Sequence, residues 1–193
     1  QNNLTISNLK NQVMRILGVD PGTNFLGYAI IETKKNKISL LTIGVVSMKH
    51  LGSHQLKLKK IFERLQEIIR GYNPDHMAIE APFYGKNVQS MLKLGRAQGV
   101  AIAAAITMDV EMTEYAPKKI KQSITGNGNA SKEQVAAMLV NILDQKLDTK
   151  NLDSTDALAT AICHHYQSSS ILGGGKKHSG WASFIKDNPD RIK

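Results

Sequence analysis

Four acidic residues stand where the chain could bring them together. Asp20 follows the buried strand pattern Ile16–Val19, and Glu80 ends a second apolar strand pattern. Asp153 and Asp156 lie one turn apart in a helical pattern, so their side chains share a face. If these element ends meet, the carboxylates would raise one another's pKa values unless a cation neutralised them. Carboxylate oxygens suit Mg²⁺ or Mn²⁺, and two such ions about 4 Å apart can activate water and stabilise the leaving oxygen in phosphodiester cleavage.

Each of these acids also has a purely structural explanation. Asp20 precedes Pro21 and Gly22, and an Asp before Pro-Gly often caps the following turn. Asp153 and Asp156 suit the positive end of a helix, and helical acids are commonly solvated surface residues. The metal hypothesis therefore depends on all four acids meeting at one place.

The charge balance favours a polyanionic partner. The 193 residues include 25 Lys and Arg against 16 Asp and Glu, which gives a formal charge of +9. Such a charge favours nucleic acid, although it could also serve solubility alone. A basic protein with an acidic metal pocket fits the requirements of a nuclease.

The composition also bears on location. Cys163 is the single cysteine, which excludes an intrachain disulfide and favours a reducing compartment. The sequence contains no run of about 18 apolar residues that could span a membrane, and residues 1–13 lack the pattern of a signal peptide. We therefore expect a cytoplasmic protein with no membrane partner.

The hydrophobic patterns predict an α/β fold in which strands come first and helices follow. The antiparallel part comprises the hairpin Ile16–Ile31 and a strand at Ile38–Val46. The remaining predicted elements are a helix at Gln55–Arg70 ended by Gly71, a strand at Asp75–Glu80, a helix at Asn87–Thr107, a strand at Val110–Tyr115, a short helix opened by Pro117, a helix capped by Ser131 and Gln134, and a helix from about Leu152 to Tyr166. This order predicts a mixed sheet with helices on its faces.

We expect three regions along the chain. Residues 1–13 form an N-terminal extension, part of which could be foreign to the native protein because Met14 stands just before the first strand. Residues 14–167 form one domain, and residues 168–193 form a tail rich in Gly, Ser and Lys. Within the domain, Gly95, Gly99 and Ala103 form a stripe of small residues that could face either the sheet or a partner subunit.

Several motifs together resemble the RuvC family of Holliday-junction resolvases. They are Ile-Leu-Gly-Val-Asp-Pro-Gly-Thr at 16–23 with Gly27-Tyr28, Ala-Ile-Glu at 78–80 followed by Phe83 and Lys86-Asn87, Leu-Lys-Leu-Gly-Arg-Ala-Gln-Gly-Val-Ala at 92–101, Lys121-Gln122, and Asp-Ser-Thr-Asp-Ala-Leu-Ala at 153–159. The resemblance runs in collinear order from about Met14 to Tyr166.

The resemblance implies a fold, an activity and partners. The fold would be RNase H-like, with a five-stranded mixed sheet. The protein would be a homodimer that resolves four-way DNA junctions by symmetrical, Mg²⁺-dependent nicking during homologous recombination and DNA repair, leaving 5′ phosphates. It would work with a branch-migration motor of the RuvA and RuvB type.

The resemblance also assigns roles to individual residues. Asp20, Glu80, Asp153 and Asp156 match the family's catalytic, metal-binding acids, which would hold two Mg²⁺ ions, with Mn²⁺ as a substitute. The positions that would contact DNA are an aromatic residue for stacking on a base and lysines for phosphate, namely Phe83, Lys86, Lys118, Lys121 and Lys132.

Two other functions compete with this interpretation. A junction-binding adaptor would bind the same DNA without cutting it, although the presence of all four acids argues against a dead site. An actin-like ATPase would use the Gly-x-Asp-x-Gly-Thr turn to hold phosphate, but that fold needs a second such loop and more residues than this chain has.

Overall fold

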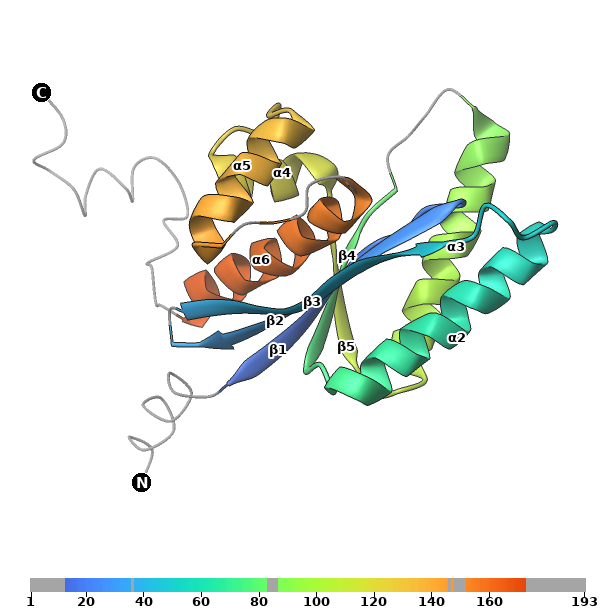
Figure 1. Ribbon diagram of the computed structural model, residues 1–193, viewed down its shortest axis with the longest axis horizontal. Coiled ribbons are helices and arrows are strands. Elements are labelled where there is room, and N and C mark those ends of the chain that lie inside the picture. The colour runs from blue at the N-terminus through green and yellow to red at the C-terminus, as the bar shows by residue number, and fades with distance from the viewer. Residues whose placement is uncertain (1–12, 36, 83–86, 146, 148–151, 173–193) are drawn as a thin grey trace, which may run out of the picture.

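A five-stranded sheet in the order β3-β2-β1-β4-β5 forms the centre of the molecule. The computed structural model describes residues 13–172 apart from 36, 83–86, 146 and 148–151 (Figure 1). The strands are β1 (Met14–Asp20), β2 (Phe25–Lys34), β3 (Lys37–Ser47), β4 (His76–Glu80) and β5 (Glu111–Tyr115). The helices are α2 (His54–Tyr72), α3 (Val88–Ile106), α4 (Pro117–Thr125), α5 (Lys132–Leu143) and α6 (Leu152–Leu172).

The sheet changes from antiparallel to parallel pairing at its centre. β1 pairs antiparallel with β2, and β2 pairs antiparallel with β3. On its other edge β1 pairs parallel with β4, which pairs parallel with β5. The mixed sheet predicted from the sequence is therefore confirmed.

The side chains of β1 point alternately to the two faces of the sheet and so contribute to two separate core layers. Leu17 and Val19 pack with α2 and α3, whereas Ile16 packs with α4, α5 and α6 on the other side of the sheet. Neighbouring strand residues point to opposite faces, so both faces of this central strand must be covered by helices. Figure 1 shows the two groups of helices on opposite sides of the sheet.

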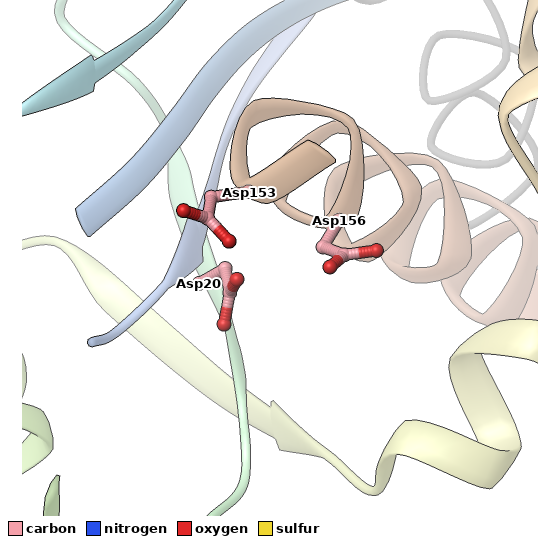
Figure 2. A group of neighbouring side chains, drawn as sticks. All are labelled: Asp20, Asp153 and Asp156. Atoms are coloured by element: carbon pink, nitrogen blue, oxygen red, sulfur yellow. The ribbon is translucent and has the colours of Figure 1, made fainter. Parts of the chain in front are cut away.

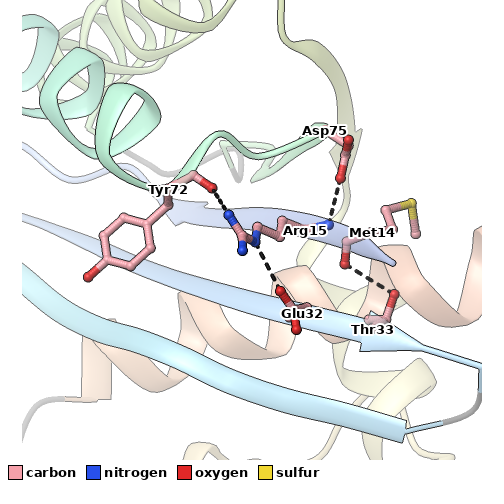
Figure 3. A network of polar contacts seen from close by, with 6 residues as sticks. All are labelled: Met14, Arg15, Glu32, Thr33, Tyr72 and Asp75. Atoms are coloured by element: carbon pink, nitrogen blue, oxygen red, sulfur yellow. Dashed lines mark hydrogen bonds and ion pairs between the residues drawn. The ribbon is translucent and has the colours of Figure 1, made fainter. Parts of the chain in front are cut away.

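A polar cluster fastens the beginning of β1 to its neighbours. Arg15 donates from Nε to a carboxylate oxygen of Glu32 on β2 at 3.0 Å and from a terminal guanidinium nitrogen to the Tyr72 carbonyl at 2.9 Å (Figure 3). The Arg15 backbone N–H donates to Asp75 at 2.7 Å. A cation suits the carbonyl end of α2, so this contact also stabilises the helix terminus. The start of β1, at the opposite end from Asp20, is thereby held in register.

Two helix boundaries differ from the sequence prediction. Gly71 does not end α2, because the helix continues to Tyr72 and Asn73 takes the left-handed conformation with φ 46°. Asn tolerates that conformation and donates its N–H to the Ile69 carbonyl, which performs the usual task of a terminal glycine. The last helix, α6, extends beyond the predicted Tyr166 to Leu172.

The small-residue stripe on α3 points away from the sheet. Gly95, Gly99 and Ala103 are exposed in the chain, while Ala97, Ala101 and Ala104 fill the contact with the core. A Cβ added at Gly95 or Gly99 would meet no atom within 4 Å among the described residues. Packing on the sheet therefore does not explain these glycines.

The terminal regions of the predicted domain scheme lie largely outside the described residues. Of the extension 1–13 the structure describes residue 13, and of the tail 168–193 it describes residues up to 172. Among the helices it does describe, none is both long and apolar enough to cross a bilayer.

Candidate metal centre and phosphate-binding hollow

Two of the four acids leave the sheet at the same edge. β1 and β4 are parallel neighbours, and Val19 pairs with Ile79 immediately before Asp20 and Glu80. Because the strands point in the same direction, their last side chains lie beside each other at the carboxyl edge. The parallel pairing alone thus brings together residues that are 60 positions apart in the sequence.

Two glycines let α6 approach this edge closely enough to supply the other two acids. A Cβ built on Gly27 would lie 1.9 Å from the Asp153 carbonyl oxygen, and one on Gly18 would lie 2.0 Å from the Ala157 carbonyl oxygen. The α6 backbone therefore rests directly on β1 and β2, which any larger residue at these positions would prevent. This contact places the first turn of α6 beside the end of β1.

The carboxylates of Asp20, Asp153 and Asp156 converge at this point. One oxygen from each lies within 4.8 Å of the others, and Figure 2 shows them meeting between the end of β1 and the first turn of α6. Glu80 joins them by lining one hollow with Asp20 and Asp156. The structure therefore brings all four acids predicted from the sequence to the same edge of the sheet.

Crowding and burial make the ionised form of two acids costly. Burial, followed by the charges of Glu80, Asp156 and Asp153, raises the pKa of Asp20 to about 8. Burial and the charge of Asp156 raise the pKa of Glu80 to about 7. Like charges this close disfavour ionisation, so without a metal the acids keep protons. A bound divalent cation would compensate their negative charge instead. A close set of hard oxygen donors with uncompensated negative charge fits Mg²⁺ or Mn²⁺.

Lys132 lies in direct contact with one of these acids. Its Nζ donates a hydrogen bond to a carboxylate oxygen of Asp156 and forms an ion pair with it. Burial lowers the pKa of Lys132, but the hydrogen bond to Asp156 and the surrounding carboxylates outweigh burial, so the net shift is upward. Lys132 is the first residue of α5. It directly follows Ser131, whose capping box with Gln134 fixes where this helix begins. The capping box predicted from the sequence is confirmed.

The hollow combines acidic and basic walls in a volume of about 540 Å³. Its lining includes the acids Asp20, Glu80 and Asp156 and the lysines Lys118, Lys121 and Lys132. Lys121 and Lys132 also lower the pKa of Glu80, which shows that their charges reach the acids. Such a hollow can hold a cation against the carboxylates and a phosphate against the lysines at the same time.

Several site residues were not identified from the sequence. Gly18 and Gly27 were not assigned their role, although a glycine inside a strand commonly marks a close approach of another backbone. Gly128 and Asn129 line the hollow, and a Cβ on Gly128 would come within 2.6 Å of Lys118 Cγ. Two predicted DNA contacts, Phe83 and Lys86, lie outside the described residues.

Comparisons with known proteins agree on one family. The model of the family described as crossover junction endodeoxyribonuclease RuvC matches residues 16–164. The chain is 58% identical to the RuvC protein of Cytophaga hutchinsonii over 178 residues, which cover 92% of this chain and 88% of the relative. It is 54% identical to that of Christiangramia forsetii over 178 residues, covering 92% of both.

Solved structures add the fold. The structure of T. thermophilus RuvC in complex with a Holliday junction substrate matches with a TM-score of 0.77 and 30% sequence identity, over 82% of this chain and 97% of that one. The yeast mitochondrial Holliday junction resolvase Ydc2 matches with a TM-score of 0.63 at 12% identity, over 94% of this chain and 87% of that one, which shows a shared fold.

Replacing Gly27 with Ala should push α6 away from β2. We expect Gly27→Ala to lower the free energy of unfolding by about 2 to 3 kcal/mol, as overpacked substitutions do, and to weaken stabilisation by Mn²⁺. Chemical denaturation with and without Mn²⁺ measures both effects. Gly71→Ala is the matched control: its Cβ meets no atom within 4 Å among the described residues, so it should stabilise α2 by about 0.5 to 1 kcal/mol. Equal behaviour of the two variants would contradict the close contact.

The raised pKa of Asp20 predicts how stability without metal depends on pH. In EDTA the folded chain keeps a proton on Asp20 up to about pH 8, whereas the unfolded chain loses it near the ordinary value of 3.8. The unfolding free energy should therefore fall as pH rises from about 4 to about 8. Asp20→Asn should reduce this slope and stabilise the protein by up to roughly 5 kcal/mol at about pH 8, because folding raises the pKa of Asp20 from 3.8 to about 8, at about 1.4 kcal/mol per pKa unit.

Thermal and chemical unfolding across this pH range check that expectation. Glu63→Gln, an exposed helical acid paired with Lys59, is the control and should leave the slope unchanged. Added Mn²⁺ should stabilise the wild type and not Asp20→Asn. An Asp20→Asn variant that is less stable than the wild type in EDTA would show that Asp20 serves the turn and not a metal.

Proposed function

We propose that this chain, which belongs to the RuvC family of crossover junction endodeoxyribonucleases, resolves four-way (Holliday) DNA junctions by metal-dependent nicking in recombination and repair. One observation carries the proposal. Asp20, Glu80 and Asp156 line one hollow together with three lysines, and the Asp153 carboxylate lies beside those of Asp20 and Asp156, within the stretch 16–164 that matches the family model. Among the rival functions, an adaptor would have no need of this arrangement, and an actin-like ATPase would need a second phosphate loop.

Junction DNA is the substrate that best fits the charge and the relatives. The T. thermophilus RuvC structure contains a Holliday junction substrate and resembles this chain over 82% of its length. The formal charge of +9 would attract any nucleic acid, so the preference for a four-way junction rests on the family and not on the charge.

Asp20, Glu80, Asp153 and Asp156 would hold the metal. Mg²⁺ is the proposed ion, with Mn²⁺ as a substitute and two ions in each site. When bound, such ions lower the pKa of a water and stabilise the leaving oxygen of a phosphodiester. The raised pKa values of Asp20 and Glu80 imply that both must give up protons before they act as ligands, so metal affinity should increase with pH.

The remaining charged residues of the hollow would bind and orient the DNA. Lys121 and Lys132 would donate to oxygens of the scissile phosphate, and Lys118 would contact a phosphate nearby. Asp156 holds Lys132 in this position through their hydrogen bond. We also propose that Phe83 stacks on a base and that Lys86 contacts the backbone. Cleavage would leave a 5′ phosphate and a 3′ hydroxyl.

The outer face of α3 supports a homodimer. Val88, Leu92 and Ile106 are 69%, 56% and 60% exposed, and they continue the exposed stripe of Gly95, Gly99 and Ala103. These residues recur every three or four positions along one side of the helix, so they form an apolar seam on which a second copy could pack. A twofold axis through this seam would present two identical sites to two DNA strands, which symmetrical nicking requires.

The cellular context is proposed on the basis of the family. Residues 14–167 would form the nuclease domain, preceded by an extension at 1–13 and followed by a tail at 168–193. We propose that the protein acts in the bacterial cytoplasm on nucleoid DNA, together with a branch-migration motor of the RuvA and RuvB type.

The proposed activity predicts paired nicks in a labelled synthetic junction. Wild-type protein with Mg²⁺ should cut two opposing strands at symmetrical positions. Asp20→Asn should slow nicking by about two to three orders of magnitude, as removal of a key electrostatic group does, while binding to the junction in EDTA is retained. Gel analysis of each labelled strand measures the products, with Glu63→Gln as the active control. Wild-type protein that binds the junction without nicking it would favour the adaptor.

The proposed dimer predicts that a charge on the α3 seam separates the subunits. Leu92→Glu should shift the protein from dimer to monomer in analytical ultracentrifugation and reduce paired nicking, because an isolated carboxylate is costly to bury. Leu56→Glu is the matched control, since Leu56 is 50% exposed on α2 and lies outside the seam. A Leu92→Glu variant that remains dimeric would place the interface elsewhere.

A further inference from the structure

A second hollow lies on the other face of the sheet from the metal centre, beside the same β1–β2 loop. It has a volume of about 350 Å³, and its walls come from this loop, the loop that leads into α2, the beginning of α2 and the first turns of α3. The polar residues in its lining that matter for binding are Asn24, Ser53, His54, Lys57, Ser90 and Lys93. Figure 1 shows that α2 and α3 both begin at the end of the sheet where β1 terminates.

The lining of the hollow includes Lys57 and Lys93 and contains no acid among the described residues. In the part of the chain that the structure describes, no ion pair involves Lys57, Lys93 or Arg96. All three cations act on the imidazole of His54, where burial and then their charges lower its pKa. Neither α2 nor α3 carries an acid in its first turn, although the positive end of a helix favours one.

The polar groups of the hollow are held ready for an acceptor. Lys57 Nζ donates to Asn24 Oδ1 at 2.7 Å, which keeps the ammonium at the β1–β2 loop. Nε2 of His54 is buried and has no hydrogen-bond partner among the described residues.

We propose that this hollow binds a backbone phosphate of the junction DNA, on the strand that passes the metal centre. The inference rests on the proposed function and adds a second contact to it. Asp20 and Asn24 are four residues apart, so their Cα atoms are separated by at most about 14 Å. DNA advances about 3.4 Å per nucleotide along one strand, so the second phosphate would lie within about four nucleotides of the scissile one.

The salt dependence of junction binding tests the proposal. Each phosphate contact contributes about 0.9 to the slope of log affinity against log salt. Lys57→Gln/Lys93→Gln should therefore lower the magnitude of the slope by about 0.9, so that its affinity loss between about 50 and about 200 mM salt is roughly three- to fourfold smaller than that of the wild type. Titration of a synthetic four-way junction in EDTA measures this without cleavage. Lys59→Gln/Lys60→Gln removes the same charge from α2 outside the hollow and should change the slope much less.

Neutral linkages locate the contact on the DNA. Methylphosphonates placed within about four nucleotides of the nick should weaken wild-type binding and should not weaken Lys57→Gln/Lys93→Gln further. Inorganic phosphate could stabilise the wild-type protein against thermal unfolding while the neutral linkages leave junction binding unchanged. That result would mean that the hollow binds a free anion, and it would overturn the proposal.

The outcomes also separate this inference from the proposed function. Wild-type protein that neither binds nor nicks the junction would refute the proposed function itself. Wild-type protein that nicks normally, with equal salt slopes for the hollow variant and its control, would refute the second phosphate contact alone. Analytical ultracentrifugation should show the same oligomeric state for the variant and the wild type. A lower slope would then not result from dissociation of a dimer.

Discussion

Mutual repulsion among carboxylates is the constraint around which this molecule is built. Asp20 and Glu80 carry raised pKa values because they are buried beside other acids, and Lys132 and Lys121 offset part of that cost. A protein keeps such an arrangement when the gain lies in binding a cation. The Arg15 cluster and the two-sided core supply the stability that holds this unfavourable site in place.

The distribution of charge separates two tasks. The acids meet where β1, β4 and α6 end or begin, whereas the positive groups surround them on α4 and α5 and recur across the β1–β2 loop at the starts of α2 and α3. A DNA strand would therefore encounter cations on both sides of the cutting point. The acids repel the phosphates of the strand, so flanking cations are needed to bring the strand to the site.

Much of the fold could be predicted from the sequence, because strand alternation, the Ser131 capping box and Pro117 each leave a local pattern. The acids could be selected because two end strands and two share a helical face. Other features depend on distant contacts. Asn73 replaces Gly71 as the end of α2, Gly18 and Gly27 matter through the α6 backbone, and the direction of the α3 stripe depends on how that helix rolls on the sheet. None of these is determined by neighbouring residues.

The contact of α6 with Gly18 and Gly27 also sets the order in which the enzyme can become active during synthesis. Asp20 and Glu80 leave the ribosome well before Asp153 and Asp156, and chains begin to fold from the N-terminus while they are still being made. A nascent chain that ends before α6 lacks half of these carboxylates. The proposed metal site is therefore complete only after α6 has been translated.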